Sequence, residues 1–405
     1  MEQTAYSRQD QGVRDAMENM ARQGCLADPA QERAADAVRP LAQPRLAWLS
    51  LDDPDDRRRY AALWKASAAR RPQDAPEYLD LVQPRHYRQV AVHYTHPGGT
   101  VLYPFFECEV RDLPGFAGAP AGMRHIVSPY GYGGPLHEGD PARKAAVSRD
   151  FEAALNAELR RRGCVTEFVR EDLFSGRLAD RTDGELVDHQ PNVVVRLRRD
   201  PESIWNGYKN TARRNIRQAQ RAGLRVSFDH RGSGLGGFLD VYYETMRRRD
   251  ASDFFFIPAE RFEALTAALC PLGNVAYVYV HDGDTVVASD LLLICGDALY
   301  AFLSASRASA FQKRPNDLMR HESIMWGHAH GYRHYVLGGG VSPSDGIYRF
   351  KLAFDAGGLV PFRTRHVIHD AAACERLVSI RRMAEAERGR PDWQPRPGFF
   401  PDYLA

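Results

Sequence analysis

The sequence predicts an α/β, or α+β, fold built from two related domains in tandem. Its 405 residues exceed the length of a typical single domain. Two segments, VAVHYTHPGGTVLYPFF (residues 90–106) and VAYVYVHDGDTVVASDL (residues 275–291), align without gaps and share seven of seventeen positions. Each copy alternates apolar and polar residues around a Gly-containing turn, HPGG or HDGD, which is the pattern of a β-hairpin. A duplicated hairpin in a chain of this length indicates a duplicated domain.

The predicted elements mix helices with strands along the whole chain. Helical patterns lie at residues 57–69, 144–161, 201–222, 238–249, 259–268 and 316–330. Strand-like segments outside the hairpins lie at residues 192–197, 224–228 and 335–337. Helices and strands interspersed in this order are typical of α/β and α+β architectures.

The expected domain organisation has four parts. Residues 1–45 are rich in Ala, Arg, Gln and Asp and lack apolar periodicity, so we expect an N-terminal extension there. The first domain is expected at residues 46–198 and the second at residues 199–345, each with one copy of the hairpin. Residues 346–405 are expected to form a C-terminal segment that packs back on the first domain. The stretch PDWQPRPGFFPDY within it predicts a Pro-rich tail along the surface rather than part of a core.

Composition excludes several classes of protein. With 54 Lys and Arg against 52 Asp and Glu, the chain has no overall polyanion-binding signature, so any basic site is a local cluster. The six cysteines form no CxxC pair, which argues against a structural zinc site or a dense disulfide framework. The N-terminus has no apolar signal segment, and no stretch of about 18 apolar residues occurs. We therefore predict a cytoplasmic protein with reduced thiols and no membrane span.

One predicted helix is unusually basic. Pro201 and Gly223 bracket the helical pattern of residues 201–222, and no Asp or Glu occurs in residues 203–228. Like charges four residues apart destabilise a helix by about 0.2–0.5 kcal/mol per pair, so an external anion is the expected partner. Arginine matches phosphate oxygens bidentately, which favours a pyrophosphate or a nucleic-acid backbone. The alternative is a solvated surface helix. The cations on this helix are Lys209, Arg213, Arg214, Arg217 and Arg221.

Four segments together resemble the FemAB family of non-ribosomal peptidyltransferases. YKNTARRNIRQAQRAGLRV is similar to the family's R-x-x-I-x-x-A-x-x-x-G segment, and GIYRFKLAFDAGG (residues 346–358) to its FK-x-x-F element. Residues 299–340 resemble the family's strand, Pro-initiated helix and final strand with glycines, and SPYGYGGPL resembles its aromatic Gly-Pro segment. The resemblance runs in pieces from about residue 46 to residue 362, and no single piece is specific.

The resemblance implies two tandem GNAT-like domains and transfer of an aminoacyl group from aminoacyl-tRNA to an amine. In the best-known family members that amine belongs to a peptidoglycan precursor. An aminoacyl ester is already activated, so the enzyme positions a neutral amine, stabilises the oxyanion of the tetrahedral intermediate and accepts a proton. The implied partners are aminoacyl-tRNA and an amine-bearing small molecule or cell-wall precursor, with no cofactor and no metal.

The same resemblance implies individual site residues. Lys351, with Phe350, falls at the family's Phe-Lys position, where the lysine stabilises negative charge at the acyl-donor end; the alternative is an ordinary lysine at the end of a strand. Tyr300 and Phe302 match a pair of site-lining aromatics on one face of a strand, although Phe302 lacks a hydroxyl. The implied catalytic residues are Lys351, Phe350 and Tyr300. The implied substrate-binding residues are Lys209, Arg213, Arg214, Arg217, Tyr130, Tyr132, Glu138, Phe302 and Ser304.

The sequence departs from the family at the acceptor side, where His137 and Glu138 follow the Gly-Pro in place of an Asp. This departure weakens the expectation of a standard peptidoglycan acceptor. By the same matching, Arg214 and Arg217 bind the phosphates of an acceptor nucleotide-sugar or of the tRNA. A small amine from a specialised pathway is the other expected acceptor.

Other motifs in the sequence bear on alternative functions. GSGLGG (residues 232–237) fits G-x-G-x-x-G, but no acidic residue follows at the position of a ribose partner, so a strand-to-helix loop is expected. The histidines of residues 321–334 do not form HExxH, and we expect no metal site there. FQKRPNDLM contains no glycine after Gln312, where acetyl-CoA-dependent GNAT enzymes carry a Gly-rich pyrophosphate loop. An acyl-CoA-dependent N-acyltransferase is therefore the second hypothesis, and a non-catalytic protein that binds nucleic acid or glycan is the third.

Overall fold

The described residues are 44–174, 176, 178–340 and 345–405 of the computed structural model. In the first half, helices α2, α3 and α4 accompany strands β1 to β6. Their bounds are β1 (Arg45–Ser50), α2 (Pro54–Ala66), α3 (Pro76–Val82), β2 (Arg88–His96), β3 (Gly99–Glu109), β4 (Arg124–Val127), β5 (Leu136–Gly139), α4 (Lys144–Arg161) and β6 (Cys164–Arg170). Residues 1–43 of the expected N-terminal extension lie outside the described residues, and β1 already begins at Arg45.

The second half has the same mixture of elements and is followed by a last strand and helix. Their bounds are β7 (Glu185–Arg196), α5 (Pro201–Gly207), α6 (Asn210–Arg221), β8 (Arg225–Asp229), α7 (Leu235–Arg248), α8 (Ala259–Leu269), β9 (Val275–Asp282), β10 (Thr285–Cys295), β11 (Ala298–Ser306), α9 (Pro315–Ala329), β12 (His334–Gly338), α10 (Gly346–Lys351), β13 (Leu359–Ile368) and α11 (Ala371–Glu387).

The two predicted hairpins are confirmed. Strand β2 pairs antiparallel with β3, with His96 opposite Gly99 at the turn. Strand β9 pairs antiparallel with β10, with Asp282 opposite Thr285. Gly99 has a φ of +152°, and a Cβ there would meet the Glu138 backbone oxygen at 2.5 Å, so only glycine fits beside β5.

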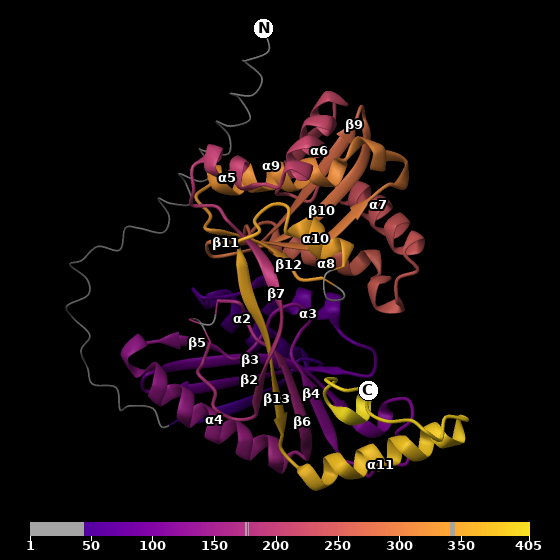
Figure 1. Ribbon diagram of the computed structural model, residues 1–405. Coiled ribbons are helices and arrows are strands. Elements are labelled where there is room, and N and C mark those ends of the chain that lie inside the picture. The colour runs from indigo at the N-terminus through magenta and orange to yellow at the C-terminus, as the bar shows by residue number, and fades with distance from the viewer. Residues whose placement is uncertain (1–43, 175, 177, 341–344) are drawn as a thin grey trace, which may run out of the picture. The chain divides into compact units, whose positions relative to one another are not determined.

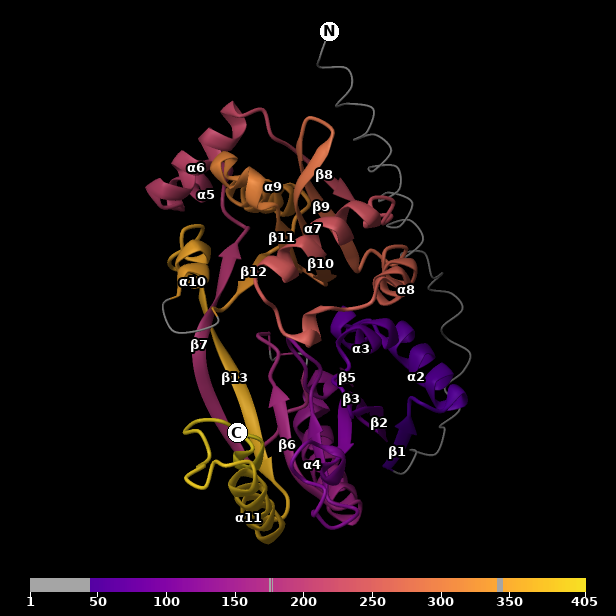
Figure 2. The same cartoon turned by 90° about the vertical axis from the view of Figure 1, so that its right-hand side faces the viewer.

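All described strands belong to one sheet. Along it the order is β1-β2-β3-β4-β6-β13-β7-β12-β11-β10-β9-β8, and β5 pairs with β3 off this path. Strand β13 is antiparallel to both of its neighbours, with Thr364 opposite Arg170 on β6 and Leu359 opposite Val193 on β7. The long strands β7 and β13 run side by side between the two halves in Figures 1 and 2. Strand β13, the last strand among the described residues, therefore lies in the middle of the sheet.

Alternate residues of the second-half strands pack on opposite layers, as expected for a sheet covered on both faces. On β9, Val278 joins the core that contains Ile216 of α6, whereas Tyr277 joins the core that contains Phe238 of α7. Helix α6 packs against α9, and α7 packs against β10 and β11. Helix α6 thus supports α9, and α7 supports β11; these two elements carry much of the candidate site.

The prediction of a single helix at residues 201–222 is wrong, because two helices, α5 and α6, occupy this range. Tyr208 (ψ 145°) and Lys209 (ψ 150°) are extended and separate α5 from α6. The Tyr208 side chain is 2% exposed and its ring lies 5.4 Å from that of Phe354, while the Lys209 N–H donates to the Ala353 carbonyl at 2.8 Å. Tertiary packing thus replaces the helical hydrogen bonds that the break removes.

The C-terminal tail also departs from the sequence expectation, because part of it is buried. The Tyr403 ring is 0% exposed and packs edge-on against Phe116, with ring centroids 5.8 Å apart. Its hydroxyl forms a hydrogen bond with Thr166 on β6. Burying an aromatic ring with a satisfied hydroxyl stabilises the tail against the first half, which a reading of Pro content alone missed.

Two findings concern the chemical setting of the described residues. Their five cysteines are all buried: Cys108, Cys164, Cys270, Cys295 and Cys374. None of their helices combines the length and the apolar character that a bilayer crossing needs.

Candidate active site

A cleft of about 460 Å³ opens in the second half of the molecule. Its walls come from the end of α7, from β11, from the first two turns of α9, from β12 and from α10. Met246, Phe302 and Leu337 give it an apolar side, and polar and cationic groups face them. The polar and cationic lining residues are Thr245, Arg249, Ser304, Ser306, Asn316, Arg320 and Lys351.

Lys351 is the last residue of α10 and lines this cleft. Its amine donates a hydrogen bond to the Gly339 carbonyl at 2.6 Å. Gly338 has a φ of +79°, and a Cβ there would lie 3.4 Å from the Lys351 amine. Burial, and after it the charge of Arg320, lower the pKa of Lys351 to about 8 against the opposing effect of the Asp345 and Asp290 carboxylates. Near neutral pH this amine can therefore serve as a cation or give up its proton.

Beneath Lys351 lies a buried ion pair between Arg320 of α9 and Asp290 of β10. Arg320 is 6% exposed and Asp290 is 0% exposed. The Arg320 guanidinium donates to Asp290, to the Ser304 hydroxyl and to the Tyr335 hydroxyl, the last at 2.5 Å. Ser304 in turn donates to the second oxygen of Asp290 at 2.7 Å. The network fixes Ser304 and places a positive charge under the cleft.

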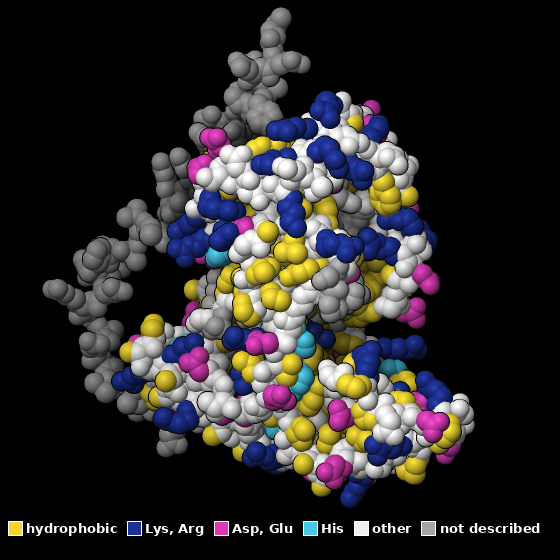
Figure 3. Space-filling view, viewed as in Figure 1, with side chains coloured by type: hydrophobic (Ala, Val, Ile, Leu, Met, Phe, Trp, Pro, Cys, Tyr) yellow, Lys and Arg dark blue, Asp and Glu magenta, His cyan; other side chains and the backbone are white. Residues whose placement is uncertain are grey.

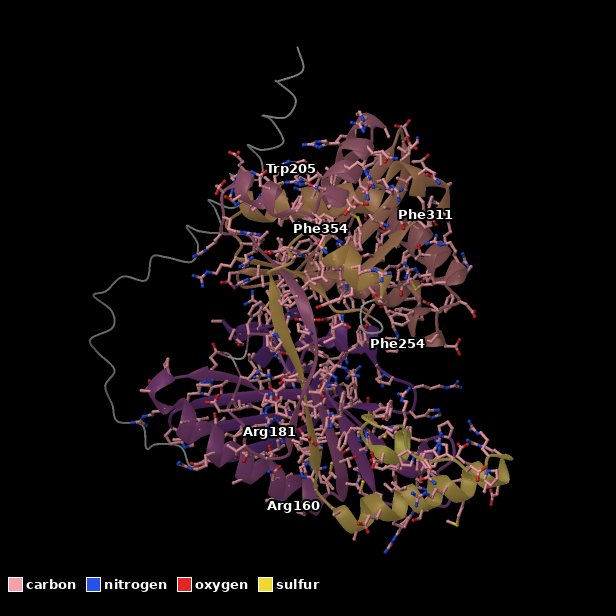
Figure 4. The ribbon with its side chains drawn as sticks, viewed as in Figure 1. Arg160, Arg181, Trp205, Phe254, Phe311 and Phe354 are labelled. Atoms are coloured by element: carbon pink, nitrogen blue, oxygen red, sulfur yellow. The ribbon has the colours of Figure 1, made fainter. Side chains whose placement is uncertain are left out.

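Aromatic residues of the first half meet β11 beside the cleft. The Tyr132 ring lies 5.6 Å from that of Tyr300, and the Tyr132 hydroxyl accepts a hydrogen bond from the Asn192 amide at 2.9 Å. The Tyr130 ring lies 6.5 Å from Phe302 and 5.5 Å from Phe254, which is labelled in Figure 4. The structure therefore brings the tyrosines of SPYGYGGPL together with the aromatic pair of β11.

A second hollow of about 450 Å³ lies along α5 and α6. Figure 3 shows Lys and Arg side chains over this part of the second half. The Arg217 guanidinium stacks 5.2 Å above the Trp205 ring, and Arg213 donates to the Asn206 carbonyl at 3.2 Å. Among the described residues that line the hollow there is no acidic side chain; they are Trp205, Asn206, Asn210, Thr211, Arg213, Arg214 and Arg217.

The structure gathers most of the residues expected at a site into these two places. Lys351, Phe350, Phe302 and Ser304 line the cleft. Arg213, Arg214 and Arg217 line the basic hollow, and Lys209 stands at the N-cap of α6 outside its lining. Lys351 ends a helix, so the alternative of a strand-end lysine is wrong.

Glu138 is not brought to either place. It lies on β5 opposite Thr100, and its carboxylate accepts a hydrogen bond from the Ala68 backbone N–H at 3.1 Å.

Backbone N–H groups of the glycine-rich segment GSGLGG bind the side chain of Asp229, the last residue of β8. The Asp229 carboxylate accepts from the backbone N–H groups of Arg231, Gly232 and Gly234 at 2.8, 2.9 and 2.7 Å. These amides are the donors that a dinucleotide phosphate would need. The Asp229 carboxylate thus occupies the backbone amides that a phosphate would need in this loop.

Sequence reasoning missed the Arg320–Asp290 pair, although a signal was present. Asp290 interrupts the otherwise apolar stretch of β10, and Arg320 stands among the buried residues Leu318, Met319 and Ile324 of α9. Ionised residues are almost never fully buried unless they are paired. An acidic and a basic residue that each stand among apolar, buried residues thus predict an ion pair. The prediction needs the knowledge that both faces of the sheet are covered.

Comparison with known proteins supports the same architecture. Residues 206–352 match the family model described as an acetyltransferase (GNAT) domain. The crystal structure of FemX superposes with a TM-score of 0.55 at 13% identity, over 77% of this chain and 95% of that one. The described part of this chain therefore has a FemAB-like tandem GNAT fold. The tandem GNAT fold and the GNAT match support an acyltransferase.

Two further structures superpose on this chain at low identity. L-PGS from Bacillus licheniformis superposes with a TM-score of 0.52 at 12% identity, over 85% of this chain and 99% of that one. A conserved protein of unknown function from Bacteroides thetaiotaomicron VPI-5482 superposes with a TM-score of 0.50 at 9% identity, over 80% of this chain and 100% of that one. No curated protein matches the sequence.

Proposed function

We propose that the protein is an aminoacyltransferase that forms an amide between the aminoacyl group of an aminoacyl-tRNA and an amine acceptor. The observation that carries the proposal is the environment of Lys351. It lies in a cleft of the size that binds small molecules. Among the described residues no carboxylate forms an ion pair with its amine, so its charge is available to a substrate.

The proposed reaction requires stabilisation of the negative charge on the intermediate more than covalent catalysis by the protein. The acceptor nitrogen attacks the ester carbon, the bond from that carbon to the ribose oxygen breaks, and the proton of the amine passes to the leaving oxygen. Protonated Lys351 stabilises the oxyanion that forms on the way, as preorganised donors do in acyl transfer. The Arg320 guanidinium lines the same cleft and is held in place by its ion pair with Asp290.

The basic hollow on α6 supplies the place for tRNA phosphates. Arginine forks pair with phosphate oxygens, and the lining of the hollow carries Arg213, Arg214 and Arg217 without a counter-charge. The Lys209 N–H bonds to the Ala353 carbonyl, two residues after Lys351. This bond connects the start of α6, beside the basic hollow, to the residues that follow α10, beside the cleft.

An acyl-CoA donor is the second candidate, because the matched family model describes acetyltransferases. The N-terminal turn of α9 argues against it. Asp317 lies in that turn and is buried, and the Gln312 carbonyl just before it already accepts a hydrogen bond from the Gln218 side chain at 2.6 Å. A pyrophosphate at this helix end would meet a carboxyl group and a loop without glycine.

Donor dependence tests the proposal. Purified protein is incubated with labelled aminoacyl-tRNAs, and separately with acyl-CoAs, in the presence of a cell extract as acceptor. Label that passes from tRNA into a ribonuclease-resistant product supports the proposal, and transfer only from acyl-CoA contradicts it.

Lys351→Ala separates an enzyme from a binding protein of the same fold. Transfer should be lost while tRNA binding stays, whereas Lys65→Ala, an exposed lysine of α2, should leave both unchanged. Tight tRNA binding without transfer from any donor, equal in wild type and Lys351→Ala, would favour the binding protein.

A further inference from the structure

The cations around the cleft differ in whether they have a partner. Arg307 pairs with Glu244 at 2.5 Å, and Arg320 pairs with Asp290. Arg249 and Lys351 line the cleft, and within the described part of the chain neither forms an ion pair. The cleft therefore presents two uncompensated cations to whatever enters it.

Acidic side chains near the cleft are engaged elsewhere. Asp290 accepts from Arg320 and Ser304, and Asp345 accepts from the backbone N–H of Tyr348 at the start of α10. Neither lines the cleft, and no other described lining residue is acidic. A substrate anion thus meets no carboxylate on the described lining, although Asp345 and Asp290 lie near enough to raise the pKa of Lys351.

Arg249 occupies a position suited to anchoring. It is the C-cap residue of α7, next to the apolar wall formed by Met246 and Phe302. Its neighbour Arg248 donates to the Ser306 carbonyl at 2.7 Å, so only Arg249 of the two keeps its guanidinium for the cleft. A single guanidinium matches a carboxylate in charge and in the spacing of its donors.

We propose that the acceptor amine belongs to a molecule that also carries a carboxylate, and that Arg249 binds this carboxylate while the amine faces Lys351. The inference rests on the aminoacyl transfer proposed above. The aminoacyl group reaches the cleft as an ester, so it brings no main-chain carboxylate, and in the proposed function the phosphates of its tRNA lie on the basic hollow of α6. The anion that complements Arg249 therefore comes with the acceptor.

The same charges favour reaction at the amine. Neighbouring cations disfavour the protonated form of an amine and so lower its pKa. An acceptor held by its carboxylate at Arg249 would present its nitrogen toward Lys351 and Arg320 in the neutral, nucleophilic form. A cationic acceptor without a carboxylate would be excluded by the same field.

Equilibrium binding tests the inference without tRNA. The probes are the straight-chain amino acids from glycine to aminocaproate, in which the amine stands at one end and the carboxylate at the other, each paired with its uncharged amide. Binding is followed by ligand-observed NMR to wild type, to Arg249→Gln and to Arg247→Gln. Arg247 is an exposed arginine of α7 that does not line the cleft, so its variant is the matched control.

We expect at least one carboxylate probe to bind wild type about fivefold more tightly than its amide, as befits an ion pair at an exposed arginine. The preference should disappear in Arg249→Gln and persist in Arg247→Gln. Equal binding of every acid and its amide, a preference that survives Arg249→Gln, or binding of no probe at all overturns the inference.

A second arm distinguishes the acceptor from an acidic donor side chain. If glutamyl-tRNA is used better than glutaminyl-tRNA, and Arg249→Gln removes that difference, the carboxylate belongs to the donor and the inference is wrong. Failure of every aminoacyl-tRNA in the transfer assay would refute the proposed function, whereas the acid-to-amide comparison reports on Arg249 alone.

Discussion

Replacing Asp290 by Ala is the most direct test of how much the Arg320–Asp290 ion pair contributes to the stability of the protein. The change leaves the Arg320 guanidinium, 6% exposed, without its counter-charge, although the Ser304 and Tyr335 hydroxyls remain. Removing one partner of a buried ion pair costs about 3–5 kcal/mol. A domain is stable by only about 5–15 kcal/mol, so the variant should be folded but much weaker.

Urea unfolding followed by circular dichroism measures this loss, with two comparison proteins. The double variant Asp290→Leu with Arg320→Met removes both charges and should recover most of the stability, because an apolar pair replaces the ionic one. Asp188→Ala removes an exposed partner of Arg363 and should cost under about 1 kcal/mol. A loss below about 1 kcal/mol for Asp290→Ala, or a double variant no more stable than the single one, would refute the reasoning.

Three further predictions concern the amine, the basic helix and a buried acid. Lys351→Ala should lower kcat by about 10²–10³-fold, and wild-type kcat should fall as the pH rises past about 8, where the amine loses its proton. Arg214→Gln with Arg217→Gln should flatten the slope of log affinity for tRNA against log salt by about 1.4, whereas Arg160→Gln on the distant α4 (Figure 4) should not. Burial raises the pKa of Asp317 from 3.8 to about 6, so its ionisation destabilises the folded protein increasingly between these values. Asp317→Asn should thus gain up to about 3 kcal/mol over wild type in urea unfolding near pH 7 and little near pH 4; an equal effect at both would contradict this.

Local patterns predicted the elements whose structure is decided locally. The hairpin turns follow from glycines between alternating segments, and the helix expected at residues 144–161 has those bounds in α4. In both cases the residues that set the structure lie within a few positions of one another.

Tertiary contacts decided what the patterns could not. The helical periodicity of residues 201–222 continues through Tyr208, yet packing against Phe354 breaks the helix there. No local signal shows that the partner of Tyr208 lies just after α10. The burial of Tyr403 in a Pro-rich tail has the same origin.

The candidate site was predictable in its residue types and not in its electrostatics. Lys351 and the aromatics of β11 came from family-like segments, and the structure places Lys351 and Phe302 in one cleft. The lowered pKa of Lys351 depends on burial and on Arg320, which a sequence cannot position. The separation of Arg249 from the paired arginines around it likewise depends on which acids reach them.

The position of β13 has a consequence for biosynthesis. The strand that separates β6 from β7 follows both of them in the sequence, so it leaves the ribosome only after the strands that it joins. Until then the nascent chain carries two open strand edges, which can pair with each other or with another chain. A premature stop before Leu359 would make that interim state permanent. Such a product should aggregate rather than persist as a smaller version of the protein.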